Sequence, residues 1–137
     1  MNIENKEKEY KSLDHLIYSC QYHVIFCPKY RKKILNEEIQ SSLKEVLYLN
    51  EEKYGYKILE LEVMEDHVHL LIDVNPKIGI FSTVCSIKGF SARYLRNKYP
   101  YLKSKLPCLW TRSCFISTVG SVSLEVVKKY IEDQKNK

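Results

Sequence analysis

Residues that interrupt regular structure are scarce in this sequence, which has only 4 glycines and 4 prolines among its 137 residues. No internal repeat and no low-complexity tract is visible, and 45% of the residues are hydrophobic. Such a composition excludes an intrinsically disordered or repetitive protein and is typical of a folded one. We expect one domain with one hydrophobic core, because 137 residues is the length of a typical domain.

Paired cysteine motifs and long apolar runs are also missing. The chain has 5 cysteines, an odd number, and no two form a C-x-x-C pair, which argues against a zinc finger and a disulfide framework. The longest apolar run is far below the roughly 18 residues that a membrane span needs, and the first residues are charged. We therefore expect no signal peptide, no membrane anchor and a cytoplasmic protein.

Positive charge is in mild excess, since 22 Lys and Arg side chains against 17 Asp and Glu give a formal net charge of +5. This balance is compatible with an anionic partner but does not identify one. Basic and aromatic residues cluster twice, and such groups can contact phosphates and stack on unpaired bases. A solvated surface is an equally weighted alternative for each of them. The candidate nucleic-acid-binding residues are Lys29, Tyr30, Arg31, Lys32, Lys33, Arg93 and Arg96.

Apolar periodicity divides the chain into alternating strands and helices. Residues 1–15 are polar and charged and are predicted to form a flexible N-terminal arm, which leaves 16–137 as the single domain. The order β-α-β-β-α-β followed by one more helix predicts an α+β fold with a ferredoxin-like split βαβ sheet. That topology serves many functions and does not name one. The predicted strands are 16–27, 56–64, 67–74 and 108–118, and the predicted helices are 37–54 capped by Asn36, 80–98, and a last helix capped by Ser123.

The strand at 67–74 carries two histidines on one face. Its side chains alternate, so Val68 begins the set that faces the core, while His67 and His69 share the opposite face about 7 Å apart. Two imidazoles at this separation could converge on one ion. A single His-x-His is a weak signal, and a pair of ordinary strand histidines is the favoured alternative when the motif is taken alone. His23, on the first strand, is expected to be structural.

The last helix carries a phenol and an amide on one face, because Tyr130 and Gln134 are four residues apart. The amide oxygen of Gln134 suits a hard divalent cation. Two imidazoles and one amide oxygen would leave coordination positions free for a phosphate oxygen. The alternative interpretation is that Tyr130 is an amphipathic side chain at the rim of the core. This alternative is excluded only if the helix docks beside the histidines.

Five segments in order give the chain a more specific resemblance. They are YHVIFCPKYRKKIL, VMEDHVHLLIDV, GFSARYLR, LWTRSCFISTVG and VVKKYIEDQ, and they cover nearly everything after about residue 16. Together they resemble the single-tyrosine HUH transposases, the TnpA-type enzymes of bacterial insertion sequences in the IS200/IS605 group.

The resemblance implies a role for each candidate residue. His67 and His69 would be two ligands of a divalent metal, magnesium or manganese, and Gln134 would be the third. Tyr130, on the additional C-terminal helix, would be the nucleophile that cleaves and rejoins single-stranded DNA through a 5′-phosphotyrosine. The implied substrate is single-stranded DNA with imperfect hairpins rather than a small molecule. The resemblance also implies a homodimer in which the tyrosine helix of one subunit can complete the histidine site of the other.

Three other functions are compatible with the residues. One is a domesticated relative that nicks chromosomal repeat hairpins, with the same chemistry but no mobile element. Another is a non-catalytic module that binds single-stranded nucleic acid, since ferredoxin-like sheets commonly do so. The last is a metal-dependent hydrolase that releases its product without a covalent bond.

Overall fold

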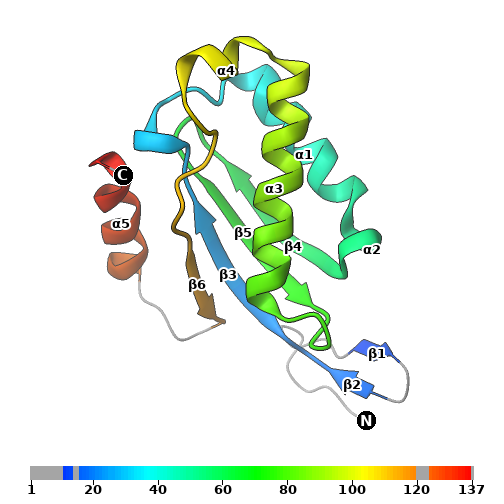
Figure 1. The fold of residues 1–137 in the computed structure, drawn as a ribbon. Coiled ribbons are helices and arrows are strands. Elements are labelled where there is room, and N and C mark those ends of the chain that lie inside the picture. The colour runs from blue at the N-terminus through cyan, green and yellow to red at the C-terminus, as the bar shows by residue number, and fades with distance from the viewer. Residues whose placement is uncertain (1–10, 14–15, 120–123, 137) are drawn as a thin grey trace.

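The computed structural model describes residues 11–13, 16–119 and 124–136. They form a mixed α+β fold in which two long helices cover one face of a four-stranded sheet (Figure 1). The strands are β1 (Lys11–Leu13), β2 (Leu16–Tyr18), β3 (Gln21–Phe26), β4 (Tyr56–Val63), β5 (Val68–Val74) and β6 (Phe115–Thr118). The helices are η1 (Lys29–Arg31), α1 (Glu37–Leu49), α2 (Glu51–Tyr54), α3 (Ile80–Lys98), α4 (Tyr101–Lys105), α5 (Leu124–Asp133) and η2 (Gln134–Asn136).

The four-stranded sheet has the order β4-β5-β3-β6, and each neighbouring pair is antiparallel. β3 and β4 therefore run in the same direction with β5 between them. In this register His69 lies opposite Ile25 of β3 and Glu62 of β4. The His-x-His segment thus lies at the start of a central strand rather than at the edge of the sheet.

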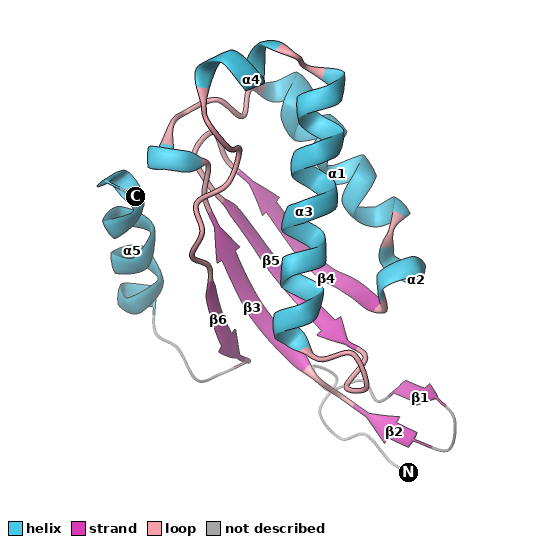
Figure 2. Cartoon of the chain, viewed as in Figure 1, coloured by secondary structure: helices cyan, strands magenta, loops and turns pink. Residues whose placement is uncertain are grey.

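The core lies between this sheet and helices α1 and α3 (Figure 2). Val68, Leu70, Ile72 and Val74 are all buried, as the alternation of the strand predicted. The other face of the sheet carries the histidines. Helix α1 begins where the sequence placed its cap, because the Asn36 side chain accepts a hydrogen bond from the amide of Ile39 at 2.9 Å.

Three predicted elements differ in the structure. The strand predicted at 16–27 is divided into β2 and β3, and β2 pairs with β1 in a separate two-stranded sheet. β1 lies within the predicted arm, whose first ten residues are outside the described part of the chain. The helix predicted at 37–54 is interrupted at Asn50, whose side-chain amide donates to the Val46 carbonyl. Ser123, the predicted cap of the last helix, also lies outside the described residues.

The strand predicted at 108–118 is the largest difference, because only Phe115–Thr118 pair with β3. Before them, a single bridge joins Trp110 to Pro28. The carbonyl groups of residues 111–113 accept hydrogen bonds from a lysine side chain instead of a neighbouring strand. Within the described residues, none of the helices has both the length and the apolar character needed to span a membrane.

Candidate active site

The two histidines lie on the sheet face opposite α1 and α3. His67 directly precedes β5, and its Nδ1 lies 2.9 Å from Oδ1 of Asp66. A carboxylate on one ring nitrogen fixes the orientation of the imidazole and leaves Nε2 for a ligand. The side chains of both partners are only 17% exposed, so the pair is partly shielded from water.

His69 is half-buried against a third histidine. Its Nε2 lies 3.2 Å from Nδ1 of His23 on β3, and the two rings are 5.4 Å apart between centroids. The pKa of His69 is lowered by burial first and by His23 second, while Glu62 and Glu60 act in the opposite direction. His69 is therefore neutral at neutral pH, which is the form of imidazole that binds a metal. A cation bound at Nε2 would replace the contact with His23.

His69 is accessible from outside through a hollow of about 590 Å³ on the sheet. This opening would admit a cation or an extended phosphodiester to the ring. The hollow is lined by Tyr48, Leu59, Glu60, Leu61, Glu62, His69 and Leu71.

Tyr130 and Gln134 lie together around one serine of the loop before β6. Ser113 donates from Oγ to Oε1 of Gln134 at 2.9 Å, and the Tyr130 hydroxyl lies 3.3 Å from the same Oγ. Because the serine has one proton and gives it to Gln134, the phenol is the donor in the second contact. Gln134 is 2% exposed, and its Nε2 donates to the Tyr130 carbonyl. The two side chains thus share one helix face, as their spacing predicted.

Burial raises the pKa of the Tyr130 phenol to about 12, and the Ser113 hydroxyl partly opposes this. The thiols of Cys27 and Cys114 raise it further. Its ring packs 5.3 Å from that of Phe115 between centroids. The phenol is therefore protonated at neutral pH, and it would need activation to act as a nucleophile.

Arg31 connects helix α5 with the turn before β5. Its Nε lies 3.1 Å from Oδ2 of Asp66, which holds His67 through its other oxygen. Its Nη1 lies 3.2 Å from Oε2 of Glu132 and donates to the Ile131 carbonyl at 3.3 Å. One guanidinium thus spans the histidine half and the tyrosine half of the site.

The donor set fits a divalent cation. In the described residues, no group of three or more His, Cys, Asp and Glu side chains could hold a metal. A cation at His67 and His69 would therefore need an amide oxygen, water or a substrate phosphate as further ligands. Gln134 offers such an oxygen, which now accepts the hydrogen bond from Ser113.

The predicted DNA-binding residues are divided between two places. Tyr30 is 47% exposed beside the Lys29 ammonium, Lys32 and Lys33 are exposed, and Arg31 is turned inward. They lie in and directly after η1, which contacts η2 at the end of the tyrosine helix. Arg93 and Arg96 belong to α3, on the other side of the sheet, and the buried Nε of Arg96 has no hydrogen-bond partner within the described structure.

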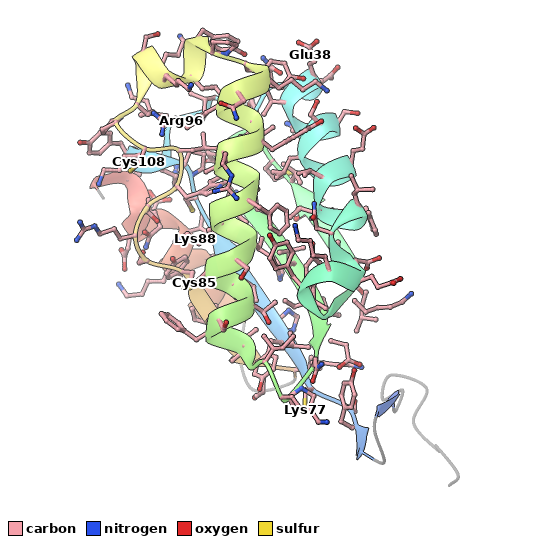
Figure 3. All side chains as sticks on the ribbon, turned by 45° about the vertical axis from the view of Figure 1, so that its right-hand side comes forward. Glu38, Lys77, Cys85, Lys88, Arg96 and Cys108 are labelled. Carbon is pink, nitrogen blue, oxygen red and sulfur yellow. The ribbon has the colours of Figure 1, made fainter. Side chains whose placement is uncertain are left out.

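Sequence reasoning missed Ser113, Lys88 and the contact of His23. Lys88 of α3 donates to the carbonyls of Thr111, Arg112 and Ser113 at 2.6, 3.2 and 3.0 Å (Figure 3). Burial lowers the pKa of this ammonium. One signal was available, since Lys88 follows the buried Val84 by one helical turn and interrupts the apolar face of α3.

Known proteins resemble this chain over nearly its whole length. The family model described as "Transposase IS200 like" matches residues 16–134. The ISDra2 transposase TnpA of Deinococcus radiodurans is 40% identical over 123 residues, with 88% of each chain covered. The transposase for insertion sequence element IS200 of Salmonella typhimurium is 32% identical over 130 residues, covering 91% of this chain and 86% of that protein.

Solved structures agree with the sequence relatives. A crystal structure of a transposase from Deinococcus radiodurans R1 superposes with a TM-score of 0.82 at 34% identity, covering 90% of this chain and 97% of that one. A REP-associated tyrosine transposase bound to a REP hairpin has a TM-score of 0.52 at 10% identity, covering 96% and 69%, and shares only the fold. These matches confirm the resemblance predicted from the five segments, and the chain belongs to the IS200-like transposase family.

Proposed function

We propose that this chain cleaves and rejoins single-stranded DNA at the ends of an insertion sequence through a 5′-phosphotyrosine on Tyr130. Family membership supports transposase activity. The observation that carries the chemical detail is the pairing of Tyr130 with Gln134 around Ser113, on a helix that Arg31 ties to Asp66 beside His67. The strand order, with β5 between the parallel strands β3 and β4, supports the ferredoxin-like split βαβ arrangement.

His67, His69 and Gln134 would hold the divalent cation, magnesium or manganese. When bound, such an ion polarises a phosphate oxygen and offsets the negative charge that develops during attack. Two imidazoles favour manganese over magnesium, which prefers oxygen ligands. Asp66 would hold the His67 ring, and Ser113 would release the Gln134 oxygen for coordination.

Tyr130 would be the nucleophile. Its oxygen attacks the scissile phosphorus in line and gives up its proton, and the bond from phosphorus to the 3′ oxygen breaks. The leaving 3′ oxygen takes up one proton to become a 3′-hydroxyl, so the step is balanced. The energy of the phosphodiester is kept in the phosphotyrosine, so a 3′-hydroxyl can later attack it and restore the phenol without ATP. The partly buried position of Tyr130 would protect this bond from water.

The substrate would be single-stranded DNA with an imperfect hairpin, held by the half-buried Lys29 and the exposed Lys32 and Lys33. We further propose that residues 16–137 form one catalytic domain, which the family match over 16–134 supports. The proposed location of this domain is the cytoplasm. A homodimer in which α5 is exchanged between subunits is also proposed. In such a dimer the contacts of Arg31 with α5 would be made between chains.

The test is incubation with manganese or magnesium and a labelled single-stranded hairpin, followed by a denaturing gel. A covalent adduct is expected, and it should be lost in Tyr130→Phe but retained in Tyr101→Phe, a control at an exposed tyrosine of α4. His67→Ala and His69→Ala should abolish cleavage and leave hairpin binding largely intact. Cleavage that survives Tyr130→Phe would indicate a hydrolase, and binding without any adduct would indicate a non-catalytic module.

A further inference from the structure

Arg31 is held by an unusual backbone. Tyr30 and Arg31 both have positive φ values, of 61° and 50°, which L side chains rarely adopt. Hydrogen bonds fix this turn, since the Arg31 amide donates to the Pro28 carbonyl and the Lys29 amide to the Leu109 carbonyl, both at 2.8 Å. Strained conformations persist where the surrounding structure determines them, and they concentrate at functional sites. Here the strained turn directs Arg31 away from solvent, while Lys32 and Lys33 after it are exposed.

The inward position gives the Arg31 side chain an exposure of only 13%, against 61% for Glu132. An ion pair with such an exposed carboxylate contributes little by itself. The contact with the Ile131 carbonyl is more informative, because the last carbonyls of a helix lack partners within the helix and carry its negative dipole end. Arg31 therefore caps the end of α5, directly next to Tyr130.

The other side of the guanidinium fixes the position of Asp66. Arg31 takes one oxygen of this carboxylate and His67 takes the other. A carboxylate with both oxygens engaged has one preferred orientation, so the ring of His67 is fixed in turn. The positive guanidinium also neutralises a carboxylate that would otherwise repel a DNA phosphate at the histidines.

We propose that Arg31 is a positioning residue that couples the docking of α5 to the orientation of His67. This inference rests on the proposed function. It adds that one guanidinium, that of Arg31, connects the tyrosine helix to the carboxylate that holds the proposed metal ligand His67. Arg31 is then a link between these groups rather than a phosphate contact, because its Nε and Nη1 face Asp66, Glu132 and a helix carbonyl. Lysine could not replace it, since one ammonium lacks the planar fork that reaches both sides.

The test compares Arg31→Gln and Arg31→Lys with Lys44→Gln, which removes an exposed positive charge on α1. Manganese affinity is measured without DNA by titration calorimetry, and hydrogen exchange is measured at the amides of α5. In Arg31→Gln, manganese affinity should fall by about tenfold or more, and exchange in α5 should accelerate. Arg31→Lys should retain protection of α5 or manganese affinity, but not both. Lys44→Gln should match the wild type.

Hairpin affinity as a function of salt distinguishes the positioning role from a phosphate contact. If Arg31 positions α5 and His67 and does not contact a phosphate, the slope of log affinity against log salt concentration is unchanged in Arg31→Gln. A slope smaller by about 1 with wild-type manganese affinity and α5 protection would overturn the proposal. Both readouts apply whether or not an adduct forms. Absence of the adduct in the wild type would therefore refute the proposed function, while the metal and exchange data would still decide on the coupling.

Discussion

Lys88 offers a stringent test of how the site is held. Its three ammonium protons match three carbonyl acceptors in the loop at 111–113, so its hydrogen-bonding capacity is fully used. The same loop presents Ser113 to Tyr130 and Gln134. Replacing Lys88 by methionine keeps most of the apolar stem and removes every donor. We predict that Lys88→Met destabilises the protein and slows cleavage together.

The size of the stability loss follows from the three acceptors. Thr111 is 2% exposed and accepts the shortest of the three bonds, so its carbonyl would lose its partner where water is scarce. An unsatisfied buried polar group costs about 1–3 kcal/mol. The other two carbonyls belong to exposed residues and can bond to water. Removing the ammonium also removes its desolvation penalty, which offsets part of the loss, because burial lowers the pKa of Lys88 and so disfavours its charged form. The net loss should be about 1–2 kcal/mol.

Urea unfolding followed by circular dichroism measures this loss. With a slope of about 2 kcal/mol per molar, the midpoint should fall by about 0.5–1 M. Lys44→Met, at an exposed position of α1, should stay within about 0.5 kcal/mol of the wild type. Single-turnover cleavage by Lys88→Met should slow about tenfold at unchanged hairpin affinity, since one displaced hydrogen bond at a reacting group has this scale. A Lys88→Met protein with the wild-type midpoint and the wild-type rate would refute the reasoning.

Three further predictions concern the phenol and the turns. Ser113→Ala removes the donor to the buried Oε1 of Gln134, which should cost about 1–3 kcal/mol of stability, and it should also slow adduct formation; a wild-type rate would show that the contact between Ser113 and the phenol does not contribute to cleavage. Because the pKa of Tyr130 is raised to about 12, the unfolded phenol ionises first as pH rises above 10.0. Above that pH, the free energy of unfolding of the wild type should therefore decrease relative to that of Tyr130→Phe. Urea unfolding at a series of alkaline pH values measures this difference, and a difference that does not change with pH would contradict the burial of the phenol. Gly55→Ala and Gly79→Ala should both lower the thermal midpoint, because Gly55 has a left-handed backbone where a Cβ would lie 2.5 Å from Cδ1 of Ile78, and Gly79 has φ 90° and ψ 155°, a region essentially restricted to glycine; an unchanged midpoint in either variant would contradict this reasoning.

Elements with a strong period were predictable from the sequence. The helix predicted at 80–98 is found with those bounds, and the inward set of β5 is buried as its alternation indicated. The same alternation put His67 and His69 on the opposite face, and helical spacing put Gln134 beside Tyr130. In each case, adjacent residues of one element decide which side chains share a face, and the sequence contains that information directly.

Contacts between elements were not predictable, because they depend on register. His23 reaches His69 only because β3 pairs with β5 so that Ile25 lies opposite His69. No period in either strand fixes that pairing. Arg31 was predicted as one of several DNA contacts, since a run of basic residues looks the same whichever side chain turns inward. Arg31 is the residue that turns inward because the backbone of this turn has positive φ values. That conformation is a property of the turn and not of the residue type.

The strand predicted at 108–118 shows why the holding residues escape periodic analysis. Its apolar and β-branched residues fit a strand, yet Thr111 to Ser113 give their carbonyls to Lys88. A ladder would have satisfied those carbonyls equally well, but its pleat would have fixed the side chain of Ser113 by alternation alone. As an irregular loop, the segment can turn Ser113 toward both Tyr130 and Gln134. The proposed nucleophile and metal ligands therefore lie on periodic elements or directly beside them, where the sequence reveals them. The residues that hold them, Ser113 and Arg31, lie where the period is broken.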